Sequence, residues 1–191
     1  MTKLFFAALA AVTLSFGATG QTAPAAPAAA TPACPALLQH TVPRLQDEKP
    51  QPLCQYAGRV LLVVNTASFC GYTPQYGALE ALHARYKDRG LAVLGFPSND
   101  FAQEKGSNRE IADFCESTFG VKFPMFVKTT VRGPDAHPFY RQLAGQSGQA
   151  PAWNFHKYLI SRDGKVVANF PSATAPDSPA VVRAIEAQLA R

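Results

Sequence analysis

Residues 60–76 constrain the fold more than any other part of the chain. They open with an apolar, β-branched run at 60–64, which is typical of a strand buried on both faces. A short polar turn leads to Cys70, after which Thr73 can serve as an N-cap and Pro74 as the first residue of a helix. Cys70 therefore falls between the carboxyl end of a strand and the amino end of a helix. An open α/β sheet exposes its ligand crevice at that edge.

This position favours the reactive form of Cys70. The unpaired N–H groups and the dipole at a helix start stabilise negative charge, and the thiolate is the nucleophilic form of cysteine. Without further context, however, a cysteine after a buried strand is more often a core residue or half of a disulfide. The position alone therefore predicts a reactive thiol and leaves its chemistry open.

Hydrophobic periodicity and turn residues predict the remaining elements. In order, they are a small hairpin made by 38–42 and 53–56, a strand at 60–65, a helix at 74–88, a strand at 91–96, a helix between a Ser107/Glu110 capping box and Gly120, a strand at 123–127, a helix capped by His137, strands at 157–162 and 165–170 joined by a type I′ turn at Asp163-Gly164, and a helix from residue 177. The short helical connection makes the strands at 60–65 and 91–96 parallel. This order matches the thioredoxin fold, so we predict an α/β domain with a mixed central sheet flanked by helices and an N-terminal hairpin extension.

The first 36 residues are expected to lie outside this domain. Residues 1–20 have the pattern of a secretory signal peptide, with Lys3, an apolar segment and small residues in succession. The apolar segment is short for a membrane span, although an uncleaved anchor is the alternative. Residues 21–36 form a Pro/Ala-rich linker. We therefore expect an exported, periplasmic or secreted protein without stable membrane insertion, whose folded domain covers 37–191.

An even number of cysteines in an exported chain raises the question of disulfides. The four cysteines can pair in three ways. Cys34 and Cys54 flank an irregular segment before the first core strand and are the candidates for one structural bridge. Cys70 and Cys115 lie in the regular α/β part, where a structural bridge and a redox role are both open.

Charge and residue spacing disfavour two other kinds of function. The formal net charge is +5, but no basic cluster or aromatic-basic stripe concentrates it, which disfavours nucleic-acid binding. The four histidines have no metal-ligand spacing, so we expect no metal site.

Several separated segments resemble the glutathione peroxidase family over nearly all of residues 37–190. They are VNTASFCGYTPQY (64–76), LGFPSNDFAQE (94–104), FGVKFPMF (119–126), HPFY (137–140) and WNFHKYLISRDGKV (153–166). The resemblance implies an enzyme, a thiol peroxidase that reduces hydrogen peroxide and organic hydroperoxides, with lipid hydroperoxides as a further option, and that protects against oxidative stress. It also implies that a thioredoxin-like protein or glutathione serves as reducing co-substrate and that no other cofactor is needed.

The same resemblance implies the site. Cys70 matches the family's peroxidatic position, Gln103 the site glutamine, and Trp153 and Asn154 the Trp-Asn pair. These three neutral N–H donors can stabilise a thiolate and a departing oxygen without adding charge. Cys115 matches the resolving cysteine of the two-cysteine, thioredoxin-linked members, which attacks the sulfenic acid and leaves an internal disulfide. Taken singly, each has a plainer interpretation: Gln103 as a loop residue, Trp153 as an edge aromatic, Asn154 as a turn-former, Cys115 as a core residue.

The chain departs from the family pattern in two segments. The family's usual Phe-Pro-Cys-Asn-Gln is replaced by residues 96–100, FPSND, and the loop before Gln103 is one residue shorter. The segment between Tyr140 and Trp153 lacks the insertion through which some members form tetramers and bind glutathione. The resemblance therefore implies a monomer that uses a thioredoxin-like reductant.

Two other functions compete on the same fold. A thioredoxin-like thiol-disulfide oxidoreductase needs Cys-x-x-Cys, but residues 70–73 read CGYT. A non-enzymatic redox or metal-delivery module needs paired soft ligands, and neither a methionine nor a second cysteine lies near Cys70 in sequence. Both are less well supported than the peroxidase.

Overall fold

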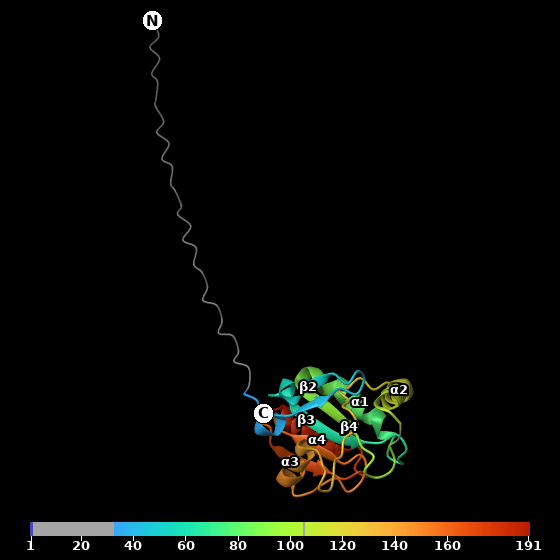
Figure 1. Ribbon diagram of the computed structural model, residues 1–191. Coiled ribbons are helices and arrows are strands. Elements are labelled where there is room, and N and C mark those ends of the chain that lie inside the picture. Colours follow the sequence, from blue (N-terminus) through green and yellow to red (C-terminus); the bar gives the residue numbers. More distant parts are fainter. Residues whose placement is uncertain (2–32, 105) are drawn as a thin grey trace. The chain divides into compact units, whose positions relative to one another are not determined.

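The computed structural model describes Met1, residues 33–104 and residues 106–191 (Figure 1). The signal peptide expected at 1–20 and the linker expected at 21–36 fall almost entirely outside the described residues. In the part of the chain that is described, no helix combines the length and apolar character needed to cross a membrane.

The described residues form short 3₁₀ helices, α-helices and strands. In chain order they are η1 (Ala36–Leu38), β1 (Thr41–Pro43), β2 (Pro50–Pro52), η2 (Leu53–Tyr56), β3 (Val60–Thr66), α1 (Gln75–Tyr86), η3 (Lys87–Arg89), β4 (Leu91–Pro97), α2 (Asn108–Phe119), α3 (Pro138–Ser147), β5 (Lys157–Ile160), β6 (Val166–Phe170) and α4 (Pro179–Leu189).

The central sheet is mixed, with the strand order β4–β3–β5–β6. β3 pairs in parallel with β4, in the register that places Val60 opposite Leu91, and antiparallel with β5. β5 pairs antiparallel with β6. The predicted parallel unit of β3, α1 and β4 is confirmed, and the mixed sheet with flanking helices is the thioredoxin-like α/β arrangement expected from the sequence.

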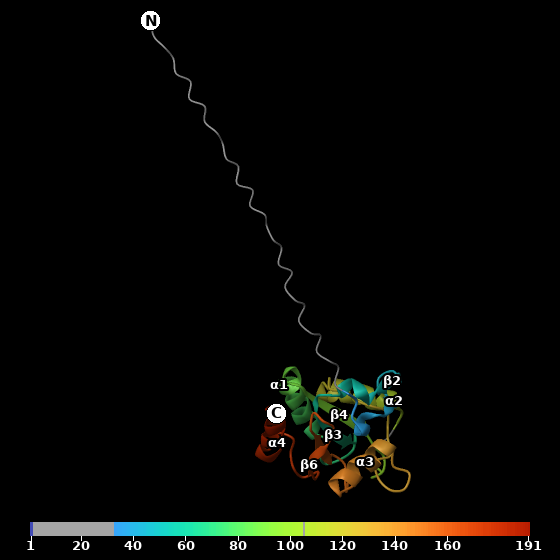
Figure 2. The ribbon, with the colours of Figure 1, turned by 90° about the vertical axis from the view of Figure 1, so that its left-hand side faces the viewer.

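Both faces of the sheet are covered, because successive side chains of a strand point to opposite faces. Val60, Leu62 and Val64 of β3 pack in one cluster with side chains from α1, α2 and α4. Leu61 and Val63 pack in a second cluster with η1 and α3. Figure 2 shows α1 and α4 on one side of the strands and α3 on the other. β3 is therefore the central strand of the core.

The hairpin and the strand expected near residue 125 differ from their predictions. The second hairpin arm is β2, and residues 53–56 form η2, because Leu53 is buried and Cys54 is tied to Cys34. Residues 123–127 do not form a continuous strand, since Pro124 has no N–H to donate; only isolated bridges remain at Met125 and Phe126.

The turn between β5 and β6 is not type I′. A type I′ turn needs a positive φ at both central residues, but in this turn Asp163 has no positive φ and Gly164 has φ 79°. The N–H of Gly164 donates to the carbonyl of Ser161, and the Ser161 N–H donates to Lys165. This is a type I turn followed by a left-handed glycine, the usual three-residue alternative.

Two predicted helix caps are confirmed. Ser107 and Glu110 form a reciprocal capping box at the start of α2, which ends at the left-handed Gly120. The imidazole of His137 accepts a hydrogen bond from the Phe139 N–H at the start of α3.

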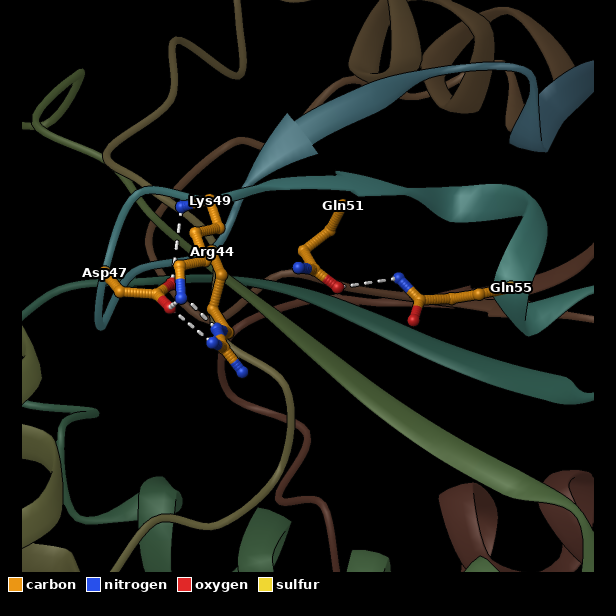
Figure 3. A network of polar contacts seen from close by, with 5 residues as sticks. All are labelled: Arg44, Asp47, Lys49, Gln51 and Gln55. Carbon is orange, nitrogen blue, oxygen red and sulfur yellow. Dashed lines mark hydrogen bonds and ion pairs between the residues drawn. The ribbon is translucent and has the colours of Figure 1, made fainter.

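The hairpin extension is held by a polar network around Asp47 (Figure 3). The Asp47 carboxylate accepts hydrogen bonds from the Arg44 guanidinium and from the Lys49 N–H. The Arg44 hydrogen bond holds the pKa of Asp47 well below its usual range. Beside this turn, Gln55 donates to Gln51 across the end of β2. These groups are exposed, so the network orders the turn more than it stabilises the domain.

A disulfide joins Cys34 to Cys54, the pair proposed from the sequence as a structural bridge. It links the chain before η1 to η2, while Pro35 packs against Gly164. Cys34 and Pro35, which fall within the expected linker, thus contact the folded domain.

We expect the Cys34–Cys54 bridge to stabilise the domain, because it closes a loop in the unfolded chain. The two cysteines are 20 residues apart, and a loop of that length corresponds to about 3 kcal/mol. Thermal unfolding of a Cys34→Ser/Cys54→Ser variant should therefore show a Tm about 6–12 °C below that of the parent. An unchanged Tm would show that the bridge adds nothing to stability.

Candidate active site

Cys70 lies in the loop between β3 and α1, with 8% of its surface exposed. The Cys70 N–H donates to the hydroxyl of Thr73 at 3.0 Å, and that hydroxyl donates to the Ala67 carbonyl at 2.9 Å. Thr73, predicted as the N-cap of the helix, therefore braces the cysteine loop instead. α1 begins at Gln75, and its N-cap position is taken by Pro74, which has no side-chain acceptor to offer.

The sulfur of Cys70 accepts a hydrogen bond from the backbone. The Tyr72 N–H lies 3.4 Å from Sγ. A charged acceptor makes a stronger hydrogen bond than a neutral one, so this contact stabilises a thiolate more than a thiol. The loop thus supplies the donor that was expected near the helix start.

The structure brings Gln103 and Asn154 together beside the cysteine loop. Asn154 is fully buried, and its Nδ2 donates to Oε1 of Gln103 at 2.9 Å. The backbone carbonyl of Gln103 accepts from the Phe69 N–H at 3.0 Å. Because the Gln103 amide oxygen is engaged by Asn154, its NH₂ group remains as a donor.

Trp153 lies at the surface of this region, with 41% of its area exposed. Its ring packs against Phe101, with ring centroids 5.1 Å apart. The Trp153 carbonyl accepts from the side chain of Asn65 at 3.1 Å. The Asn65 carbonyl in turn accepts from the Phe155 N–H at 2.6 Å.

Asn65 was not predicted from the sequence as a site residue. It is fully buried near the end of β3 and connects this strand to the segment that carries Trp153. The available signal was the first polar residue after five apolar ones, just before the cysteine loop. A buried amide needs hydrogen-bond partners, which marks the position as one where segments meet.

Left-handed residues flank two of the predicted site residues. Ala102, with φ 54°, precedes Gln103, and Phe155, with φ 62°, follows Asn154. Such conformations are costly for residues other than glycine and persist only where the surroundings impose them. The backbone therefore changes direction sharply next to each of these two amide side chains.

The shortened loop before Gln103 is held by its own side chains. Asp100 accepts from the N–H groups of Val131 and Arg132, at 2.7 and 3.1 Å. Asn99 accepts from the Glu104 N–H at 3.0 Å. The departures from the family pattern thus leave Gln103 in contact with Asn154.

Cys115 lies in α2 and is 2% exposed, in the same apolar cluster as Cys70 and Tyr76. Burial raises the pKa of Cys115 to about 11, and the Glu104 carboxylate acts in the same direction. The Tyr76 hydroxyl acts in the opposite direction, although it approaches without the geometry of a full hydrogen bond. Both Cys70 and Cys115 are free thiols. Within folded α2, Cys115 is therefore protonated at neutral pH and shielded from solvent.

An apolar hollow of about 300 Å³ adjoins the cysteine loop. It is lined by Ser68, Phe69, Gly106, Glu110, Ile111 and Phe114. Phe69, which precedes Cys70, is 59% exposed. No group of three or more His, Cys, Asp or Glu side chains that could hold a metal ion occurs within residues 33–104 and 106–191.

Comparison with known proteins agrees with this arrangement. The family described as Glutathione peroxidase matches residues 38–144. The glutathione peroxidase-like peroxiredoxin gpx1 of Schizosaccharomyces pombe is 46% identical over 140 residues, covering 71% of this chain and 89% of that protein. The hydroperoxy fatty acid reductase gpx1 of Synechocystis is 47% identical over 142 residues, covering 69% and 84%. The thioredoxin/glutathione peroxidase BtuE of Escherichia coli is 41% identical over 176 residues, covering 79% and 96%.

The chain is also similar to solved structures, both of the same family and of more distant proteins with the same fold. The crystal structure of Trgpx in apo form has a TM-score of 0.65 at 34% identity, covering 81% of this chain and 96% of that one. A thiol:disulfide interchange protein of Chlorobium tepidum has a TM-score of 0.57 at 17% identity, covering 78% and 92%. The second likeness shows the thioredoxin-like fold alone.

His156 gives the segment after Asn154 a dependence on pH. Its ring packs 4.7 Å from that of Tyr158 and is almost fully buried, and Nε2 has no partner among the described residues. Burial lowers the pKa of His156 to about 4, with the Lys157 charge acting in the same direction.

We expect the protein to lose stability as the pH falls from about 6.5 to about 4. In that window the unfolded chain binds a proton at His156 that the folded chain does not, so protonation favours unfolding by about 1–3 kcal/mol. A His156→Phe variant keeps the ring packing without the titration. Its urea midpoint should therefore change less over this window than that of the parent, and equal slopes would contradict the role of His156.

Proposed function

This chain belongs to the glutathione peroxidase family and reduces hydroperoxides at the expense of a thiol, and we propose that Cys70 is the residue that attacks the peroxide. The observation that carries the proposal is the convergence at the Cys70 loop. Tyr72 donates to the sulfur, and the Gln103–Asn154 pair is attached to this loop through the Phe69–Gln103 hydrogen bond.

In the first step, the Cys70 thiolate attacks the terminal oxygen of the hydroperoxide. A sulfur–oxygen bond forms, the O–O bond breaks, and the other oxygen leaves with its electron pair and takes up a proton to give an alcohol or water. Gln103, Asn154 and the indole N–H of Trp153 are the proposed donors to the charge on sulfur and on the departing oxygen. Cys70 is left as a sulfenic acid.

In the second step, Cys115 resolves this sulfenic acid. Its sulfur attacks that of Cys70, a disulfide forms, and the oxygen leaves as water. Because Cys115 is buried on the inner face of α2, we propose that α2 opens to bring the two sulfurs together. α2 has 12 residues and depends on packing for its stability, so its opening is less costly than unfolding of the sheet. A dithiol reductant then returns both cysteines to the reduced state.

Three observations support the choice of substrate and reductant. The apolar hollow beside Phe69 suits the organic part of a hydroperoxide, and a relative is a hydroperoxy fatty acid reductase. The Escherichia coli relative is a thioredoxin/glutathione peroxidase. We therefore propose organic hydroperoxides, lipid hydroperoxides included, together with hydrogen peroxide as substrates. A thioredoxin-like protein is the proposed reductant of a monomeric enzyme that protects against oxidative stress.

We expect the two cysteines to fail in different ways when replaced. A Cys70→Ser variant should show no peroxide consumption, because the nucleophile is gone. A Cys115→Ser variant should oxidise once, rapidly, and then stall with a thioredoxin-type donor, because no internal disulfide can form. Stopped-flow measurements follow the oxidation of each variant by peroxide, and steady-state measurements follow its turnover. Comparison of turnover with thioredoxin and with glutathione identifies the reductant.

Cys34→Ser/Cys54→Ser is the matched control and should keep its turnover. Hydrogen exchange across residues 107–119 should be faster in the Cys70–Cys115 disulfide form than in the reduced form. Parental oxidation at the rate of a free thiol, or turnover by Cys70→Ser, would rule out the proposed role of Cys70. Identical exchange in the two forms would rule out the opening of α2.

The proposed location is the periplasm or the cell exterior. The pattern of residues 1–20 supports export, as does the Cys34–Cys54 disulfide, since such bridges persist in oxidising compartments. Expression of the full chain in a bacterial host should place the protein outside the cytoplasm, with its first residues removed. A variant lacking residues 2–20 should stay in the cytoplasm. Recovery of the full-length mass from the cytoplasm would contradict export.

A further inference from the structure

Lys157 is a buried cation with no role in the peroxidase mechanism described above. It opens β5 and is fully buried. No carboxylate among the described residues lies within ion-pair distance of its ammonium group. Burial lowers the pKa of Lys157 to about 8. Burying an ammonium without a counter-ion is costly, so a methionine or leucine would fill the same space more cheaply.

Two backbone carbonyls take the place of a counter-ion. Nζ of Lys157 donates to the carbonyl of Phe155 at 2.7 Å and to that of Thr174 at 2.8 Å. Thr174 lies in the loop between β6 and α4. The ammonium thus joins the segment before β5 to a loop that comes later in the chain.

The Phe155 carbonyl belongs to the strained turn beside Asn154. Phe155 is left-handed, with φ 62°, a conformation that a bulky side chain adopts only where its surroundings impose it. Its N–H is bound by Asn65 and its carbonyl by Lys157, so the peptide groups on both sides of the left-handed residue are held. Its ring packs edge-on against Tyr76, with centroids 5.3 Å apart.

The orientation of Asn154 follows from this turn. Asn65 binds the Trp153 carbonyl on one side of Asn154 and the Phe155 N–H on the other. The left-handed bend then directs the Asn154 side chain to Gln103. Release of the Phe155 carbonyl would let the turn relax and the amide pair separate.

We propose that Lys157 is a positioning residue, whose hydrogen bond to the Phe155 carbonyl maintains the turn that aims Asn154 at Gln103. Lys157 acts through Asn154 and touches neither peroxide nor thiol. Its effect on activity rests on the proposed function, because Asn154 matters to the rate only if it assists Cys70. Its effect on the turn itself is independent of that function.

The test compares full-length Lys157→Met with Val181→Ala, a core control in α4. Methionine keeps the length of the side chain and removes the donor. Oxidation of Cys70 by hydrogen peroxide should slow by about tenfold or more in Lys157→Met, as expected for a misplaced site group. The control should stay close to the parental rate at an equal or larger loss of Tm. Trp153 is the only tryptophan, so its emission in the reduced protein should shift in Lys157→Met and not in the control.

A double-mutant cycle separates positioning from a general structural effect. Once Asn154→Ala has removed the side chain, adding Lys157→Met should slow the reaction little further. The proposal would be overturned if the two substitutions slowed Cys70 oxidation by independent factors that multiply in the double variant. It would also be overturned if Lys157→Met had the oxidation rate and the Trp153 emission of Val181→Ala. Lys157→Leu, which also removes the donor, provides the same cycle if Lys157→Met does not fold. If the parent reacts only as fast as a free thiol, the proposed function fails, and the emission of Trp153 alone decides the role of Lys157.

Discussion

β3 is buried on both faces, and this burial obliges the polar groups at its carboxyl end to find partners inside the protein. Asn65 bonds to the segment around Trp153 and Phe155, and the Thr66 carbonyl accepts from the N–H of Ser98 beyond β4. The segments before β5 and after β4 are thereby attached to the strand end from which the Cys70 loop emerges. The candidate site therefore lies where the polar groups at the buried end of β3 form hydrogen bonds with other segments.

The position of this site could be predicted because it follows from local patterns and topology. An apolar run followed by Cys70 and a helix start places the thiol at one edge of the sheet. Parallel pairing of β3 and β4 brings the loop that carries Gln103 to the same edge. Gln103 and Asn154 themselves were selected through the resemblance to the family, and their contact is seen only in the structure.

The details that escaped prediction depend on contacts between distant segments. Ala102 and Phe155 are left-handed without being glycine, so their sequence carries no sign of the bend. Thr73 has the residue type and position of an N-cap, but its hydroxyl oxygen accepts from the Cys70 N–H and not from the first turn of the helix. Lys157 begins a strand like any other lysine, and its burial depends on a loop reached only after β6. Propensity describes a residue's neighbours in sequence, whereas these features are set by neighbours in space.

α2 contributes to two different parts of the site. Ile111 and Phe114 line the apolar hollow, and Cys115 lies in the core cluster one turn after the buried Ile111. A movement of α2 that exposes Cys115 must therefore dismantle that lining. If α2 opens as proposed, the hollow cannot hold an apolar tail while Cys115 is exposed. Departure of the reduced product would then precede formation of the disulfide, and one helix would set the order of these two steps without a separate gate.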